Sequence, residues 1–187
     1  KAPKPRMLHY TSMGIVCPVE TPEGASCGLI KNLALLAHVR IGNPSRYISE
    51  QLDYMDQVVP LLEKNFRGGI PILLNGVLYG YTYNNSSANE LMDNFRQLRR
   101  SLTIPFDTTI AWVDGSVIFD TDPGCLLRPL IIASEIYRFN NAVSNCSSGT
   151  SLWIHLLSSG IIEYVDKQEE NALRIGFNPR VLEENAT

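Results

Sequence analysis

The chain has 187 residues, of which 44% are hydrophobic and 19% are charged, and its net charge is −3 at pH 7. These values are typical of a globular protein, and the negative balance argues against a free-standing nucleic-acid binder, which usually carries a basic excess. Four cysteines without a CxxC pair argue against a structural zinc site, and no run reaches the roughly 18 apolar residues of a membrane span.

The N-terminal part predicts a loop flanked by short elements. Residues 1–16 are polar and irregular except for a short strand at 13–16. Prolines and glycines predict a loop over 17–28, and apolar residues at helical spacing predict a helix just after Gly28. A strand is expected over 39–41, and the sequence Gly-Asn-Pro at 42–44 marks a first boundary.

The middle of the chain predicts two hairpins and two helices. We expect a short helix within 46–58, a hairpin over 70–83 that turns at Asn75-Gly76, and a second hairpin that turns at Asp114-Gly115. A capping box from Ser87 to Glu90 predicts a helix that runs to about residue 102. Its three arginines, Arg96, Arg99 and Arg100, favour a solvated face.

The last third predicts a buried strand over 125–134, a polar link over 138–150, and a short helix over 151–160. Ser151 is its expected N-cap and Gly160 its stop. A final hairpin is expected between 161–165 and 172–177. The fold class is therefore α+β, with β-hairpins and small mixed sheets, short packed helices and two subdomains.

Glu20 and Glu23 are the most obvious chemical pair. Two carboxylates can act as acid and base if their environments separate their pKa values, but no matching His, Ser or Cys lies nearby in the sequence. A hydrolase active site and a two-metal site both remain open interpretations of this pair, although few residues support either. Alternatively, Glu23 stabilises the start of the following helix, where exposed N–H groups could also receive an anion.

Residues 4–34 also form one long motif, KPRMLHYTSMGIVCPVETPEGASCGLIKNLA. It resembles the second-largest (β-type) subunit of multisubunit DNA-directed RNA polymerases, in which the pattern reads roughly K-P-R-x-L-H-x-T-x-x-G-x-[IV]-C-P-x-E-T-P-E-G-x-x-x-G-L-[IV]-K-N-L-A. ILLNGVLYG, LLRPLII and LLSSGIIEYVDKQEE resemble later segments of the same subunit. The resemblance is to the eukaryotic, archaeal or large-DNA-virus type.

The resemblance implies a division of the chain. Residues 1–42 correspond to the C-terminal part of the fork region, 43–140 to the external-2 domain, and 148–187 to the segment that leads to the hybrid-binding region. The chain is then expected to be a fragment, catalytically silent by itself, of an enzyme that transfers nucleotidyl groups. The alternative is a free-standing protein-interaction module with a polymerase-derived fold.

The resemblance also implies roles. The fragment holds no catalytic residue and no metal, since the Mg²⁺ of the parent enzyme is bound elsewhere. Glu23 and Glu20 support the active centre from behind, and Lys4, Arg6, His9, Ser26 and Lys31 are the candidate nucleic-acid contacts. At position 26 bacterial enzymes typically carry Asn, so this Ser removes an amide available to RNA.

The expected partners are the other polymerase subunits, especially the largest one, together with template DNA and nascent RNA, and no membrane. The expected location is intracellular: the nucleus, or the cytoplasm or virion if the protein is viral.

Overall fold

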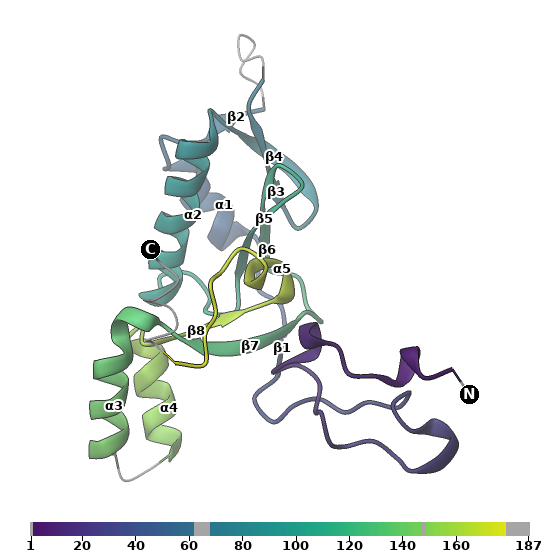
Figure 1. Ribbon diagram of the computed structural model, residues 1–187. Helices are drawn as coiled ribbons and strands as arrows, with labels where there is room; N and C mark the ends of the chain where they lie inside the picture. The colour runs from purple at the N-terminus through teal and green to yellow at the C-terminus, as the bar shows by residue number, and fades with distance from the viewer. Residues whose placement is uncertain (1, 62–67, 147–148, 179–187) are drawn as a thin grey trace.

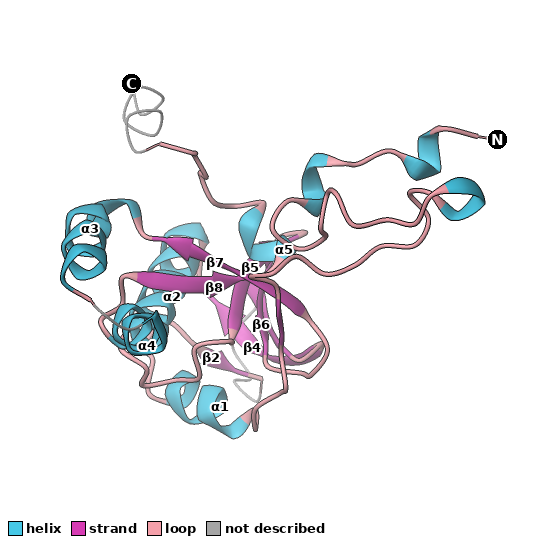
Figure 2. Ribbon diagram, turned by 90° about the horizontal axis from the view of Figure 1, so that it is seen from below, coloured by secondary structure: helices cyan, strands magenta, loops and turns pink. Residues whose placement is uncertain are grey.

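The computed structural model describes residues 2–61, 68–146 and 149–178. Within them the chain folds as predicted into an α+β structure, which contains a five-stranded and a three-stranded sheet with helices packed beside them (Figure 1). Residues 2–37, which we call the arm, extend away from the remaining described residues, which we call the body (Figures 1 and 2).

The five-stranded sheet has the order β2-β4-β3-β6-β5, in which the β3–β6 pair is parallel and the other pairs are antiparallel. Its strands are β2 (Val59–Pro60), β3 (Ile70–Leu74), β4 (Val77–Thr82), β5 (Thr109–Val113) and β6 (Ser116–Asp120). Both predicted hairpins are confirmed. Asn75 and Asp114 adopt positive φ angles of 50° and 48°, each followed by a glycine with positive φ, as a type I′ turn requires.

Helices α1 (Arg46–Asp53) and α2 (Asn85–Arg100) supply the helical part of the main core. Leu91 and Phe95 of α2 are fully buried, and the Phe95 ring lies 4.5 Å from the ring of Phe119 in the sheet. The predicted capping box is wrong: the Asn84 side chain caps α2 by accepting from Ser87 N at 2.9 Å, so Ser87 lies inside the helix.

The three-stranded sheet has the order β1-β7-β8, formed by β1 (His38–Val39), β7 (Leu126–Ile131) and β8 (Ile162–Val165). Beside it lie η4 (Ala133–Glu135), α3 (Ile136–Asn145) and α4 (Gly149–Ser158). The predicted polar link over 138–150 is therefore wrong for most of its length. Phe139 and Ala142 lie three residues apart on α3 and pack against buried Leu156 and its neighbours. This packing stabilises the helix despite the polar asparagines between them.

Two further expectations about the C-terminal part fail. Ser151 lies within α4 and is not its N-cap, although Gly160 does end the helix with a φ of +64°. The predicted last hairpin is absent from the described residues up to 178, because β8 pairs with β7. The charged segment forms helix α5 (Lys167–Glu170), capped by the Asp166 carboxylate, which accepts from Glu169 N at 2.7 Å.

A buried ionic network joins α2 to β8 and α5. Arg99 donates from Nη1 to Glu169 Oε2 at 2.7 Å and from Nη2 to Glu163 Oε2 at 3.0 Å, and all three side chains are buried. Arg100 adds two bonds to Glu163, and Arg96 Nε lies 3.6 Å from Glu169. The predicted solvated face of α2 is thus wrong, because Arg99 and Arg100 neutralise carboxylates 63 to 70 residues away.

Arg40 ties the end of β1 to the five-stranded sheet. Its side chain is fully buried, and its guanidinium donates to the Asp120 carboxylate at 2.7 Å, to the Asp120 carbonyl and to Thr109 Oγ1. The backbone N–H of Arg40 also donates to Cys125 O at 2.9 Å. A residue just beyond the arm is therefore built into the body.

The ion pairs predict an acid-sensitive fold. Burial alone would raise the pKa of Glu163, but hydrogen bonds from Arg100 and the charge of Arg99 lower it, and Arg128 and Lys167 likewise outweigh burial and lower the pKa of Glu170. A lowered folded pKa contributes stability that is present above the unfolded pKa and is lost as pH falls through the folded value.

We therefore expect the free energy of unfolding to fall as the pH is lowered below about 5. Urea unfolding at a series of pH values between 7 and 3 (roughly the range in which carboxylates titrate) measures this fall. Glu163→Gln removes one of the titrating groups, so its curve should be flatter than that of the wild type. Parallel curves for the two proteins would contradict the assignment.

Candidate functional site

The arm carries every candidate site residue that the sequence analysis singled out. It contains three short 3₁₀ turns, η1 (Lys4–Arg6), η2 (Tyr10–Ser12) and η3 (Gly24–Ser26), and otherwise irregular backbone. The strand expected over 13–16 is a turn that ends in an isolated bridge between Val16 and Leu33. The helix expected after Gly28 does not form.

Extended pairing takes the place of that helix. Cys17 N donates to Asn32 O at 2.9 Å, and Ala34 N donates to Ile15 O at 2.9 Å. These bonds align residues 15–17 with 32–34, so the chain between them leaves and returns as one long loop. The helix N-terminus that could have received an anion is consequently absent from the arm.

Side chains inside the loop fix its shape. Thr21 Oγ1 accepts from Gly28 N at 2.8 Å and donates to Ile30 O at 3.1 Å. Asn32 Nδ2 donates to Glu20 O at 3.3 Å. The sequence analysis assigned no role to Thr21 or Asn32, although both lie within the quoted motif, because their backbone partners are nine and twelve residues away.

Arg6 closes the loop from outside. Its Nη1 donates to Ala25 O at 2.7 Å and to Cys27 O at 2.8 Å, which places this predicted nucleic-acid contact against the loop backbone. Gly28 has a φ of +75°, and a Cβ at this position would lie 2.3 Å from Arg6 O. Only glycine fits so close an approach, so Arg6 and Gly28 together define the loop.

The side chains of Glu20 and Glu23 are exposed to solvent. Neither carboxylate makes an ion pair or hydrogen bond within the part of the chain that the structure describes. Glu23 directly precedes η3 but makes no capping bond, and the helix whose start it was expected to stabilise does not form, so that interpretation is wrong. The pair also has no acid–base partner among the described residues, which leaves the hydrolase reading without support.

The remaining candidates differ in how free their side chains are. Lys4 and Lys31 are exposed, and no ion pair holds either of them within residues 2–61, 68–146 and 149–178. His9 Nδ1 lies 2.7 Å from Thr11 Oγ1 at the start of η2, and the half-buried Ser26 accepts at its carbonyl from Leu29 N. The arm carries three cations and two carboxylates, against a net charge of −3 for the chain.

The arm also exposes a large share of its apolar side chains. Ile15 is its one buried large hydrophobic residue within residues 2–37. Ten others are at least 48% exposed: Met7, Leu8, Tyr10, Met13, Val19, Leu29, Ile30, Leu33, Leu35 and Leu36. Such a surface is typical of a segment that packs on another chain or domain.

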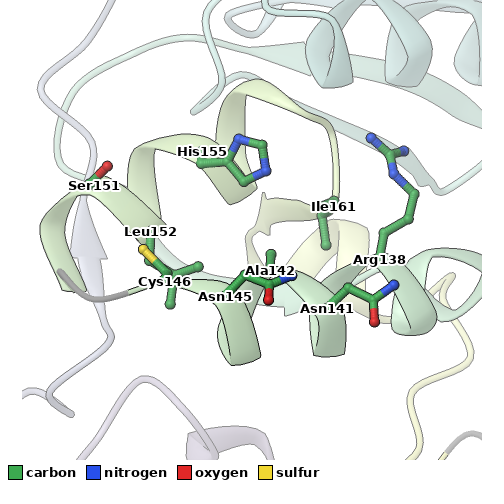
Figure 3. A pocket seen from close by; sticks show the side chains of 9 residues that line it. All are labelled: Arg138, Asn141, Ala142, Asn145, Cys146, Ser151, Leu152, His155 and Ile161. Atoms are coloured by element: carbon green, nitrogen blue, oxygen red, sulfur yellow. The ribbon is translucent and has the colours of Figure 1, made fainter.

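The body holds a separate pocket of about 500 Å³ between α3 and α4 (Figure 3). Arg138, Asn141 and Asn145 line it from α3, and Ser151 and His155 line it from α4. Its polar side chains have local partners, since Arg138 pairs with Glu135 at 2.6 Å and His155 Nδ1 lies 3.4 Å from Ser159 Oγ. This pocket therefore offers no assembled catalytic group.

Neither a metal-binding cluster nor a membrane-spanning helix occurs in the described part of the chain. No three His, Cys, Asp or Glu side chains in residues 2–61, 68–146 and 149–178 gather so that they could hold a metal ion. The carboxylates present there do not fit a Mg²⁺ site, which needs several oxygen ligands in near-octahedral geometry. In the same ranges no helix has the length and apolar character needed to cross a membrane.

Three family models match the chain in sequence order. They are RNA polymerase Rpb2, domain 3, at residues 1–39; RNA polymerase Rpb2, domain 4, at residues 72–134; and RNA polymerase Rpb2, domain 5, at residues 153–187. The first match covers the arm, the second covers β4 to β7, and the third covers β8 and α5, so the described residues span three consecutive domains of the family.

Individual polymerase subunits also match nearly the whole chain. The chain is 32% identical over 209 residues to DNA-directed RNA polymerase II subunit RPB2 of Schizosaccharomyces pombe, with 98% of the chain covered. It is 33% identical over 196 residues to DNA-directed RNA polymerase subunit Rpo2 of Saccharolobus solfataricus, with 95% covered. In each case the match spans only 17% of the relative's length.

Proposed function

Because the chain belongs to the family of second-largest subunits of DNA-directed RNA polymerases, of eukaryotic and archaeal type, we propose that it works as part of an enzyme that transcribes DNA by nucleotidyl transfer. The observation that supports this most strongly is the ordered match of three consecutive subunit domains over the arm and the body.

Within that enzyme we propose that the arm lines the active centre beside the RNA–DNA hybrid. Its loop has a fixed backbone shape, exposed carboxylates and exposed lysines, which supports a surface that meets other groups rather than a self-contained catalytic site. Lys4, Arg6, His9, Ser26 and Lys31 are the residues we propose for nucleic-acid contact. The residues 1–42, 43–140 and 148–187 would act as the fork, external-2 and following segments.

The proposed partners are the other polymerase subunits, above all the largest, with template DNA and nascent RNA. Mg²⁺ would neutralise charge on the reacting phosphates in the complete enzyme, held by residues outside this chain. The exposed apolar side chains of the arm support its burial in such an assembly. For a eukaryotic polymerase the location is the nucleus, and for a viral one the cytoplasm or virion.

The test is to tag the product of the native coding sequence and purify it from its own cells. We expect a longer subunit that copurifies with a larger partner and incorporates nucleoside triphosphates into RNA on a DNA template. The 187-residue chain alone should be inactive in the same assay. A native product of this length that binds protein partners without any polymerase activity would instead support the interaction module.

A further inference from the structure

The base of the arm lies against Arg128 of β7 and Lys167 of α5, and both side chains pair with Glu170 of α5; we call these three residues the arm-base cluster. Lys167 Nζ donates to Met13 O at 3.3 Å. This hydrogen bond joins the arm to the body. The cluster is therefore a polar attachment of the arm.

The cluster is held in a single geometry by its own ion pairs. Arg128 donates from Nε and Nη2 to the two oxygens of Glu170, at 3.0 and 2.8 Å. Lys167 Nζ donates to the same carboxylate at 2.7 Å. A two-point bond between guanidinium and carboxylate fixes the plane of both groups, so the surface that meets the arm is rigid.

The arm approaches this surface through a glycine. Gly14 has a φ of +74°, and a Cβ added there would lie 2.5 Å from Arg128 Cδ and 3.3 Å from its Nη1. Any side chain would displace either the Arg128 side chain or the backbone of the arm. The backbone thus lies directly on Arg128, and Gly14 is needed both for its conformation and for its lack of a side chain.

We propose that Arg128, Lys167 and Glu170 are positioning residues that fix the base of the arm at Met13 and Gly14 and thereby set where the Cys17–Gly28 loop lies. The transmission is short, because Ile15, Val16 and Cys17 immediately follow Gly14 and pair with 32–34. The effect of this placement on nucleotide addition rests on the proposed function, whereas the placement itself does not.

Hydrogen exchange in the assembled polymerase, with the complete subunit, tests the placement. In Arg128→Gln and Lys167→Met, we expect the amides of residues 15–34 to exchange about tenfold faster, the effect of losing one charge-assisted hydrogen bond. Amides of β3 to β6 should exchange as in the wild type. Lys167→Arg keeps a donor near Met13 O and should restore much of the protection. Arg138→Gln, which breaks an exposed pair on α3, is the matched control and should change neither region.

Gly14→Ala probes the same contact from the side of the arm and replaces no residue of the cluster. It should accelerate exchange in the same segment. Unchanged exchange of the arm in these variants, or equal acceleration in arm and body, overturns the inference. Faster exchange of the arm together with slower or less accurate RNA elongation supports both proposals. Faster exchange with normal elongation supports the positioning role and counts against the proposed place of the arm in the active centre.

Discussion

Replacing Arg99 by methionine is expected to lower the free energy of unfolding by about 3–5 kcal/mol, the usual cost of removing one partner from a buried ion pair. Burial alone would lower the pKa of Arg99, but Glu169 and Glu163 outweigh it and hold that pKa above its ordinary value. Without the guanidinium, both carboxylates would remain buried with only Arg96 and Arg100 near them. Urea unfolding followed by the fluorescence of the two tryptophans measures the loss.

Arg138→Met is the matched control for this substitution, because it removes an arginine from an exposed pair with Glu135. Exposed pairs contribute only about 0–1 kcal/mol, so the control should stay within that range. The double variant Arg99→Met/Glu169→Met should lose less than the sum of the two single changes, since the uncompensated charge disappears with its partner. Equal losses in Arg99→Met and Arg138→Met would show that the network contributes no more than a surface pair.

The sequence predicted the elements of the body that depend on local signals. The hairpins at Asn75-Gly76 and Asp114-Gly115 follow from residues that tolerate positive φ between apolar runs. The long helix that became α2 follows from the spacing of its apolar residues, although the capping residue was assigned three positions too late. In each case the deciding contacts lie within a few residues, so a single sequence contains the information.

Elements that depend on distant partners were predicted wrongly. The segment 161–165 has one strand partner, and the sequence offered a nearby candidate at 172–177, whereas the structure pairs it with β7. Arg99 looked solvated because its partners Glu163 and Glu169 are 64 and 70 residues away. No local pattern distinguishes an arginine on a wet helix face from one that meets a buried carboxylate of a later element.

In the arm, a local pattern predicted a helix that does not form. Its apolar spacing after Gly28 favoured a helix, but most helical stability comes from packing an apolar face, and Leu29, Ile30, Leu33 and Leu36 have no body surface to pack on. The family resemblance, not the local pattern, identified this segment as a candidate site. The residues that hold its base, Arg128, Lys167 and Glu170, lay in segments quoted for the resemblance, but only the structure brings them to Gly14.

Helix α5, Lys167–Glu170, connects the buried Arg99 network to the base of the arm. Glu169 faces the core and pairs with Arg99, while the adjacent Glu170 pairs with Arg128 beneath the arm. Adjacent residues of a helix point about 100° apart, so one short helix can meet both partners. Loss of the Arg99 network is consequently expected to loosen the base of the arm as well, whereas loss of the arm-base cluster leaves the main core intact.

Replacing Glu23 by alanine or glutamine is expected to slow nucleotide addition by about 100-fold in the assembled polymerase, the scale on which a misplacement of about 1 Å of a reacting group acts. The reason is that its exposed carboxylate is held at the end of a fixed loop and has no partner in the described part of the chain. We propose that this partner is a lysine elsewhere in the complete subunit, oriented by Glu23 near the RNA 3′ end. Single-nucleotide addition and misincorporation on a defined template measure the effect.

The two substitutions separate charge from shape. Glu23→Gln keeps the length of the side chain and removes its charge, so equal slowing in Glu23→Gln and Glu23→Ala indicates that the charge matters. Slowing in the alanine variant alone would indicate that the side chain only fills space. Glu90→Gln, at an exposed site on α2 far along the chain from the arm, is the matched control for charge and should elongate normally. Normal rate and fidelity in both Glu23 variants would contradict the proposed role, because an outward carboxylate that can be removed without consequence is not a contact of the active centre.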